Sequence, residues 1–102
     1  MDLPPSLVKP DTDLQWRELG PGTRWATVHK FPQGGTLYRI HGDPGATFPG
    51  HTHRGGEEVY VMAGDYSDGY GRFEAGTFLS YPAGSHHAPS TERGCELLVI
   101  WW

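Results

Sequence analysis

Glycine and proline interrupt this chain at short intervals, and this spacing constrains its fold more than any other feature. Fifteen Gly and nine Pro are distributed over 102 residues. Both residues disfavour a helix interior, glycine through its conformational freedom and proline through its missing N–H. No stretch has apolar residues at the i, i+3, i+4, i+7 spacing of an amphipathic helix without a Gly or Pro inside it. The chain is therefore predicted to contain little helix.

Short runs of β-branched and aromatic residues lie between these interruptions, which is typical of strands. The segments that separate the runs are rich in turn-forming residues, as in PQGG, GDPG, SDGYG and PAGS. Many short strands joined by such turns indicate an all-β fold, either a sandwich or a barrel. The five expected strands are Trp25–Phe31, Thr36–His41, Glu58–Met62, Thr77–Tyr81 and Cys95–Trp102.

The length of the chain fits one domain, because typical domains have about 100–150 residues. Its first ten residues contain three prolines and are expected to be extended. We predict an extended N-terminal arm over residues 1–12, either loose or packed on a neighbouring subunit, and a single domain over residues 13–102.

Charge and cysteine content exclude several classes of function. A net charge of −4 with eight Lys and Arg argues against a surface for nucleic acid or anionic membrane. The N-terminal stretch has no apolar run long enough for a signal peptide or a membrane span, so a soluble, cytoplasmic protein is expected. The single cysteine, Cys95, excludes a disulfide framework and a Cys-ligated zinc site, and it is expected to be a small buried hydrophobe.

The final apolar run, residues 97–102, has apolar residues on both faces of its predicted strand. Burial on both sides would explain this pattern, and so would a subunit interface, so we expect a homodimer. Tyr38, Tyr60 and Phe78 are expected to lie in the core or to line a pocket.

The octapeptide HTHRGGEE brings two imidazoles and two carboxylates together. If this segment is extended, as Pro49 favours, His51 and His53 point to the same side and form a ready chelate for a metal ion. A carboxylate beyond the two glycines can turn back to the same ion, and strand parity alone does not choose between Glu57 and Glu58.

A second group of imidazoles follows at His86 and His87, and with it the spacings match two motifs. The first, G(X)5HXH(X)3E(X)6G, begins at Gly45, and the second, G(X)5PXG(X)2H, begins at Gly76. The chain from about Asp11 resembles the ChrR-like cupin family. The resemblance is carried by the segments DTDLQWRELGPG, HTHRGGEEVYVMAGDYSD and YPAGSHHAPSTERGCELLVIWW.

This resemblance implies a cupin jelly-roll β-barrel with one divalent metal ion between facing strands. Position by position, it implies that the metal ligands are His51, His53, Glu57 and His87. It makes His86 a non-ligand near the mouth of the site. The second motif often ends with Asn four residues after its histidine, where this chain has Thr91. His29 and His41 lie within predicted strands and are expected to be packed or solvent-facing.

Ligand type alone leaves the metal open: Fe2+ or Zn2+ is favoured, and Mn2+, Ni2+ and Cu2+ are also compatible with three imidazoles and a carboxylate. Four protein ligands around tetrahedral zinc make a closed structural site, whereas six-coordinate iron keeps two positions for substrate and O₂. If Glu57 leaves the metal, one further position opens. Glu57 is therefore the predicted catalytic residue, because its attachment to the metal decides between a closed structural site and an open catalytic one.

Three functions are compatible with the sequence, and the resemblance implies the first two. The first is a metal-dependent dioxygenase, an oxidoreductase that acts on a small diketone or aryl ketone with Glu57 as a fourth or labile ligand. The second is a zinc-bearing module that senses a ligand or an oxidant and acts on a partner protein. Because the chain begins close to the cupin region, we expect no separate sigma-binding domain. The third is a non-oxidative cyclase or isomerase. A metal-stabilised barrel without chemistry is the plainest alternative.

Overall fold

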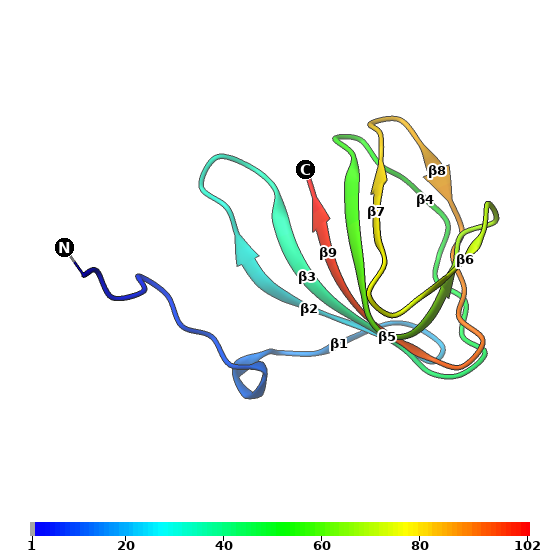
Figure 1. Ribbon diagram of the computed structural model, residues 1–102, viewed down its shortest axis with the longest axis horizontal. Helices are drawn as coiled ribbons and strands as arrows, with labels where there is room; N and C mark the ends of the chain where they lie inside the picture. Colours follow the sequence, from blue (N-terminus) through cyan, green and yellow to red (C-terminus); the bar gives the residue numbers. More distant parts are fainter. Residues whose placement is uncertain (1) are drawn as a thin grey trace.

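The computed structural model describes residues 2–102, which form almost entirely antiparallel strands (Figure 1). The one helical element in this range is a 3₁₀ turn, η1 (Asp11–Asp13). No helix among these residues is long and apolar enough to cross a membrane. The strands are β1 (Arg17–Gly20), β2 (Thr23–Lys30), β3 (Thr36–Gly42), β4 (His51–Thr52), β5 (Glu57–Ser67), β6 (Arg72–Glu74), β7 (Phe78–Tyr81), β8 (His86–His87) and β9 (Cys95–Trp101).

All five predicted strands are confirmed, as β2, β3, β5, β7 and β9. Their bounds differ from the prediction by one or two residues, except that β5 continues to Ser67 through a stretch interrupted by Gly64. Four short strands were missed: β1, β4, β6 and β8. Each has two to four residues, too few to show an alternating pattern in the sequence.

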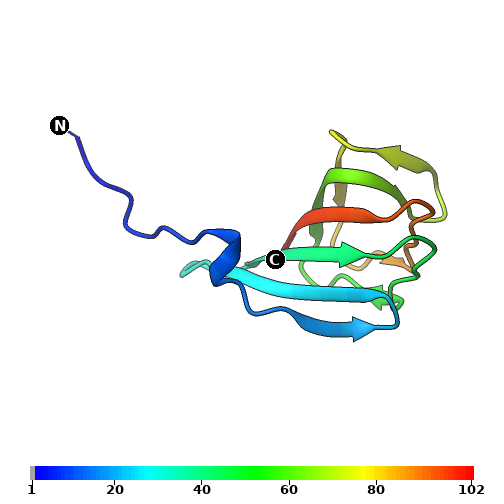
Figure 2. The ribbon, with the colours of Figure 1, turned by 90° about the horizontal axis from the view of Figure 1, so that it is seen from below.

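The strands form two sheets. The larger has the order β1-β2-β3-β9-β5-β6, with β7 paired to β5, and the smaller consists of β4 and β8. The larger sheet is strongly curved (Figures 1 and 2). Side chains from β4, β8, β5 and β9 line one interior cavity, so the small sheet faces the large one across it. This curved, two-sheet arrangement matches the predicted jelly-roll barrel.

The core lies between these sheets. Along β9, Leu97 and Val99 are buried, whereas Leu98 and Ile100 on the other face are half-buried. Cys95 is also buried, and burial raises the pKa of its thiol to about 11, as expected for a small hydrophobe rather than a nucleophile. The buried cluster consists of Phe48, Val59, Val61, Tyr66, Cys95, Leu97 and Val99.

Two aromatic residues do not lie where they were predicted. Tyr60 and Phe78 are 43% and 62% exposed, so their placement in the core or a pocket was wrong. They pair with each other across β5 and β7, on the outer face of the large sheet. Tyr38 was placed correctly, because its side chain packs against the core and lines a groove. Apolar strand residues alternate between two faces, and the sequence does not show which face is covered.

A buried carboxylate ties β5 to the turn before β9. Asp65 accepts hydrogen bonds from the backbone N–H groups of Glu92 (2.8 Å) and Arg93 (3.0 Å), and from Arg93 Nε (3.0 Å). Thr91 Oγ1 donates to the backbone oxygen of Asp65 (2.7 Å) and lies 3.1 Å from the Asp65 carboxylate. Burial would raise the pKa of Asp65, but these donors outweigh burial and hold the pKa well below its usual range. Thr91, where related motifs often have Asn, therefore has a structural role.

Residues 2–10 project from the barrel and are exposed (Figure 1). Two contacts attach the end of this segment to the outer side of β2 and β3. Lys9 Nζ donates to the carbonyl of Val28 (2.8 Å), and Arg39 Nη1 donates to Asp11 Oδ2 (2.6 Å). Residues 2–10 contain no helix or strand, and η1 begins at Asp11, within the last two residues of the predicted arm.

Candidate metal centre

The paired strands β4 and β8 bring two separate histidine motifs together. In the antiparallel register His51 lies opposite His87, and Thr52 lies opposite His86. The backbone N–H of His53 donates to the carbonyl of Ser85 (2.8 Å), which extends the pairing by one residue. Since side chains alternate along a strand, His51, His53 and His87 share the inner face.

The two glycines of the octapeptide turn the chain from β4 into β5. Gly56 has φ of 94°, which an L side chain rarely adopts. A Cβ atom on Gly55 would collide with the carbonyl group of Trp102. Glycine is therefore required at both positions, the first for space and the second for backbone conformation. The turn brings Glu57, the first residue of β5, back towards the histidines.

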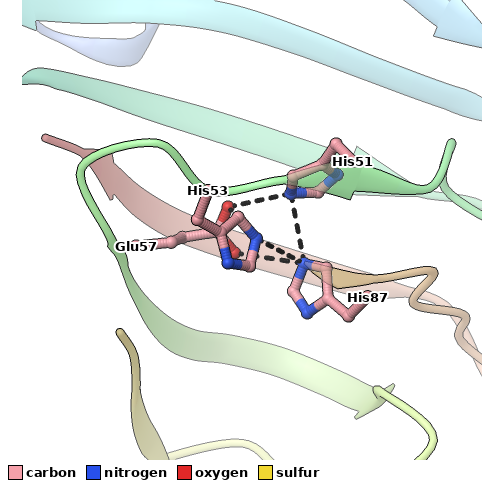
Figure 3. Close-up of side chains that lie close together, drawn as sticks. All are labelled: His51, His53, Glu57 and His87. Carbon is pink, nitrogen blue, oxygen red and sulfur yellow. Dashed lines mark hydrogen bonds and ion pairs between the residues drawn. The ribbon is translucent and has the colours of Figure 1, made fainter. Parts of the chain in front are cut away.

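The four predicted ligands meet at one point (Figure 3). One ligand atom from each of His51, His53, Glu57 and His87 lies within 4.8 Å of all the others. Glu57 Oε2 is 3.1 Å from His51 Nε2 and 3.4 Å from His53 Nε2, and Glu57 Oε1 is 3.5 Å from His87 Nε2. The Nε2 atom of His87 lies 3.0 Å from that of His53 and 3.1 Å from that of His51.

Hydrogen bonds on the far side of two imidazoles determine which nitrogen carries a proton. His51 Nδ1 lies 3.0 Å from the carbonyl of Pro49, which can only accept, so this nitrogen is the donor. Ser85 Oγ donates to the carbonyl of Pro82 (2.7 Å) and therefore accepts from His53 Nδ1 (2.7 Å). In the neutral rings both Nε2 atoms then present a lone pair to the centre, as metal-binding histidines do.

Burial keeps two of the rings neutral. His53, Glu57 and His87 are only 4%, 3% and 4% exposed, and His51 is half-buried. Burial lowers the pKa of His87 to about 4 and also lowers the pKa of His53. The hydrogen bond with Glu57 raises the pKa of His51. The acceptor nitrogen of His53 thus lies 3.0 Å from His87 Nε2 and beside a carboxylate, a set of donor atoms suited to a cation. The residues present fit a divalent metal ion.

The other predicted histidines and the second carboxylate lie outside this cluster. His86 points away from it and contacts Thr52 (Nδ1 to Oγ1, 3.1 Å), and Glu58 accepts from Trp102 Nε1 (3.4 Å) at the surface. His41 lies between Glu96 and Asp43, whose hydrogen bonds raise its pKa. His29 packs edge-on against Phe31.

Two neighbouring hollows share part of their lining, and the inner one reaches the ligand cluster. The inner cavity, about 130 Å³, is bounded at one end by His51, Glu57 and His87 and elsewhere mainly by apolar side chains of β5 and β9. The outer groove, about 230 Å³, is lined by Leu19, Trp25, Tyr38, Ile40 and Trp101. Leu19, Ile40 and Trp101 line both hollows.

Sequence reasoning missed two aromatic residues at this site. The ring of Tyr81 packs against His87 (4.6 Å between centroids) and His53 (5.4 Å). Trp101 donates its indole N–H to Glu57 Oε2. Neither residue belongs to a motif, and the strand register that brings Trp101 opposite Glu57 is a long-range pairing without a local sequence signal.

Comparisons with known proteins identify the family of this chain. The family model described as the ChrR cupin-like domain matches residues 5–102. The anti-sigma-E factor ChrR of Cereibacter sphaeroides is 36% identical over 90 residues, which are 86% of this chain and 41% of that protein.

Solved structures share the fold. The structure of Rhodobacter sphaeroides SigE in complex with the anti-sigma ChrR aligns with a TM-score of 0.82 and 29% identity, over 91% of this chain and 51% of that one. An acetylacetone dioxygenase from Acinetobacter johnsonii aligns with a TM-score of 0.80 and 14% identity, over 99% of this chain and 75% of that one, a likeness of fold alone. The chain spans about half the length of the ChrR chains it matches or less. It belongs to the family of ChrR cupin-like domains.

Proposed function

We propose that this domain binds one divalent metal ion through His51, His53, Glu57 and His87. The observation that carries the proposal is the convergence of three imidazole Nε2 atoms and a carboxylate, with His51 and His53 holding their Nδ1 atoms in outward hydrogen bonds. A divalent cation would take the place of the protons that these ligand atoms otherwise share. Fe2+ and Zn2+ are the favoured ions, and the donor set also suits Mn2+, Ni2+ and Cu2+.

We further propose a dioxygenase-type activity on a small diketone or aryl ketone. The inner cavity supports this proposal, because three of the four ligands line it. A metal ion held by His51, His53, Glu57 and His87 would supply Lewis acidity towards the enolate form of such a substrate. In the net reaction one carbon–carbon bond is cleaved, O₂ is the oxidant, and both of its atoms end in the two carbonyl-containing products.

The side chains of the barrel have defined parts in this activity. The walls formed by Val59, Leu97 and Val99 exclude water and fit the apolar part of a small ketone. Glu57 supplies the negative charge of the site and acts as the fourth or labile ligand. The likeness of this fold to an acetylacetone dioxygenase supports the choice of substrate class.

Oxygen uptake tests the activity. Protein loaded with Fe2+ is expected to consume one O₂ for each molecule of acetylacetone or of an aryl diketone, and the His87→Ala variant is expected to consume none. The matched control is His86→Ala, because His86 is the neighbouring histidine outside the cluster. The proposed activity is wrong if the loaded wild type consumes no oxygen with any diketone or aryl ketone in the series.

A second function is favoured by the 36% identity to the anti-sigma-E factor ChrR. In this alternative the domain is a zinc-bearing sensor that responds to a ligand or an oxidant and acts on a partner protein. Four protein ligands suit tetrahedral zinc, which leaves no position for a substrate. Zinc-loaded protein is then expected to retain a partner in a pull-down and to release it on oxidation. Retention that is unaffected by oxidant would contradict the sensor.

A further inference from the structure

Trp101 contacts the carboxylate of Glu57, whose attachment to the metal ion would decide between a closed and an open centre. Strands β5 and β9 are paired so that Glu57, the first residue of β5, lies opposite Trp101, the last residue of β9. In this register the indole Nε1–H donates to Glu57 Oε2, the oxygen that also faces His51 and His53. Among residues 2–102, no other group outside the histidine cluster donates a hydrogen bond to this carboxylate.

The position of the indole is determined by the residue that follows it. The backbone N–H of Trp102 donates to the carbonyl of Gly56 (3.2 Å), and its ring stacks on Phe31 with 6.3 Å between centroids. A Cβ atom on Gly35 would lie 2.7 Å from the Trp102 ring, so glycine leaves room for it there. Trp102 thereby holds the end of β9 against the turn that carries Glu57.

Packing alone does not account for this placement. The side chain of Trp101 is 42% exposed, although it contacts Tyr38 edge-on at 5.9 Å and lies over His51 at 5.0 Å between ring centroids. A residue needed only to cover apolar surface would not require the indole N–H. A buried carboxylate, in contrast, is strongly destabilised without donors, and a hydrogen bond to the charged form is about twice as strong as one between neutral groups.

We propose that Trp101 is a positioning residue that keeps Glu57 on the metal ion as its fourth ligand. The indole occupies Oε2 and holds the carboxylate at the imidazoles, so that Glu57 stays bound. This inference rests on the proposed metal site and concerns the one ligand whose attachment decides between a closed and an open centre.

Cobalt binding to four proteins tests the inference: wild type, W101F, E57A and the double variant. Phenylalanine keeps an aromatic ring at position 101 and removes the N–H donor. Loss of a residue that orients a metal ligand typically weakens binding by about 10–100-fold, and W101F is expected to weaken Co2+ binding by at least about tenfold. The visible spectrum of Co2+-loaded W101F is expected to move to that of E57A. In the E57A background, W101F is expected to have no further effect on affinity or spectrum.

The matched control is W25F. Trp25 lines the outer groove but not the inner cavity that Glu57 lines, so this variant is expected to keep the wild-type affinity and spectrum. Hydrogen exchange of the wild-type indole groups gives a second measurement that does not depend on the folding of W101F. In the Zn2+-loaded wild type the Trp101 indole N–H is expected to be protected from exchange with solvent. In E57A it is expected to lose this protection.

The outcomes separate this role from the metal site itself. A wild-type protein that binds no Co2+ would contradict the proposed metal site and this role with it. Wild-type binding with an unchanged affinity and spectrum in W101F would overturn the role of Trp101 alone. Equal effects of W101F in the presence and absence of the Glu57 carboxylate would also overturn it, since they would show a packing role.

Discussion

Asp65→Asn removes the charge of the buried carboxylate that holds β5 to the turn before β9. The side chain keeps its shape, but one of its oxygens becomes an NH₂ group that faces donors. One carboxylate oxygen accepts from the backbone N–H of Glu92, and the other accepts from two groups of Arg93. The substitution therefore breaks at least one of these hydrogen bonds and leaves its buried donor without an acceptor.

A hydrogen bond to a charged group contributes about 1.5–3 kcal/mol, and a buried donor left without a partner costs about a further 1–3 kcal/mol, so the loss amounts to about 3–6 kcal/mol. Domains of this size have unfolding free energies of about 5–15 kcal/mol, and each kcal/mol shifts Tm by about 4–8 °C. We expect Asp65→Asn to lower Tm by about 12 °C or more. The turn that it loosens follows His87 closely, so metal affinity is expected to fall as well.

Urea unfolding followed by tryptophan fluorescence measures this effect. The control is Glu74→Gln, which removes the solvent-exposed partner of Arg93, a kind of ion pair that contributes about 0–1 kcal/mol. Since the pKa of Asp65 is held below 3.8, its contribution is present above that pH and is lost as the pH falls through the lowered value. An unfolding free energy of Asp65→Asn within about 1 kcal/mol of wild type would refute the role of this carboxylate.

Three further predictions concern strands β9, β3 and β7. Leu97→Ala is expected to lower the unfolding free energy by about 2–5 kcal/mol, and Leu98→Ala on the half-buried face by less; equal losses in urea unfolding would contradict the observed alternation. NMR titration of wild type is expected to give His41 a pKa above 6.5, and the Glu96→Gln substitution is expected to lower that pKa. The stabilisation that this pair contributes to the fold is present below pH 6.5 and is lost as the pH rises through the raised pKa. A His41 pKa at or below 6.5 in wild type would contradict the contact. We propose that the chain forms a homodimer through the exposed outer face of the large sheet, which carries Phe78. Light scattering is then expected to show a dimer for wild type and a monomer for Phe78→Glu. A monomeric wild type would exclude this dimer.

Strands with clear local patterns could be predicted from the sequence. The runs that became β2, β3, β5, β7 and β9 each combine β-forming residues with flanking turn residues. The two-residue strands β4 and β8 have no such pattern, because they exist through their pairing with each other. Their histidines were nevertheless recognised, since the motif spacing and the family resemblance do not depend on strand length.

The identity of the ligands could be predicted, but their surroundings could not. Motif spacing selected Glu57 over Glu58, and the structure brings Glu57 to the histidines while Glu58 lies at the surface. The contact from Trp101 depends on a pairing between residues 44 positions apart, which no local pattern reports. Similarly, the exposure of Tyr60 depends on whether anything covers the outer face of the sheet, which is a tertiary property.

The metal content of the purified protein tests the central claim most directly. Elemental analysis of wild type, purified without added metal ions and then dialysed against Fe2+ or Zn2+, is expected to give one divalent ion per chain. His53→Ala and His87→Ala, handled in the same way, are expected to retain almost none, while His86→Ala retains the full amount. Wild-type protein that holds no stoichiometric metal, or ligand variants that hold as much as wild type, would contradict a metal centre at this site.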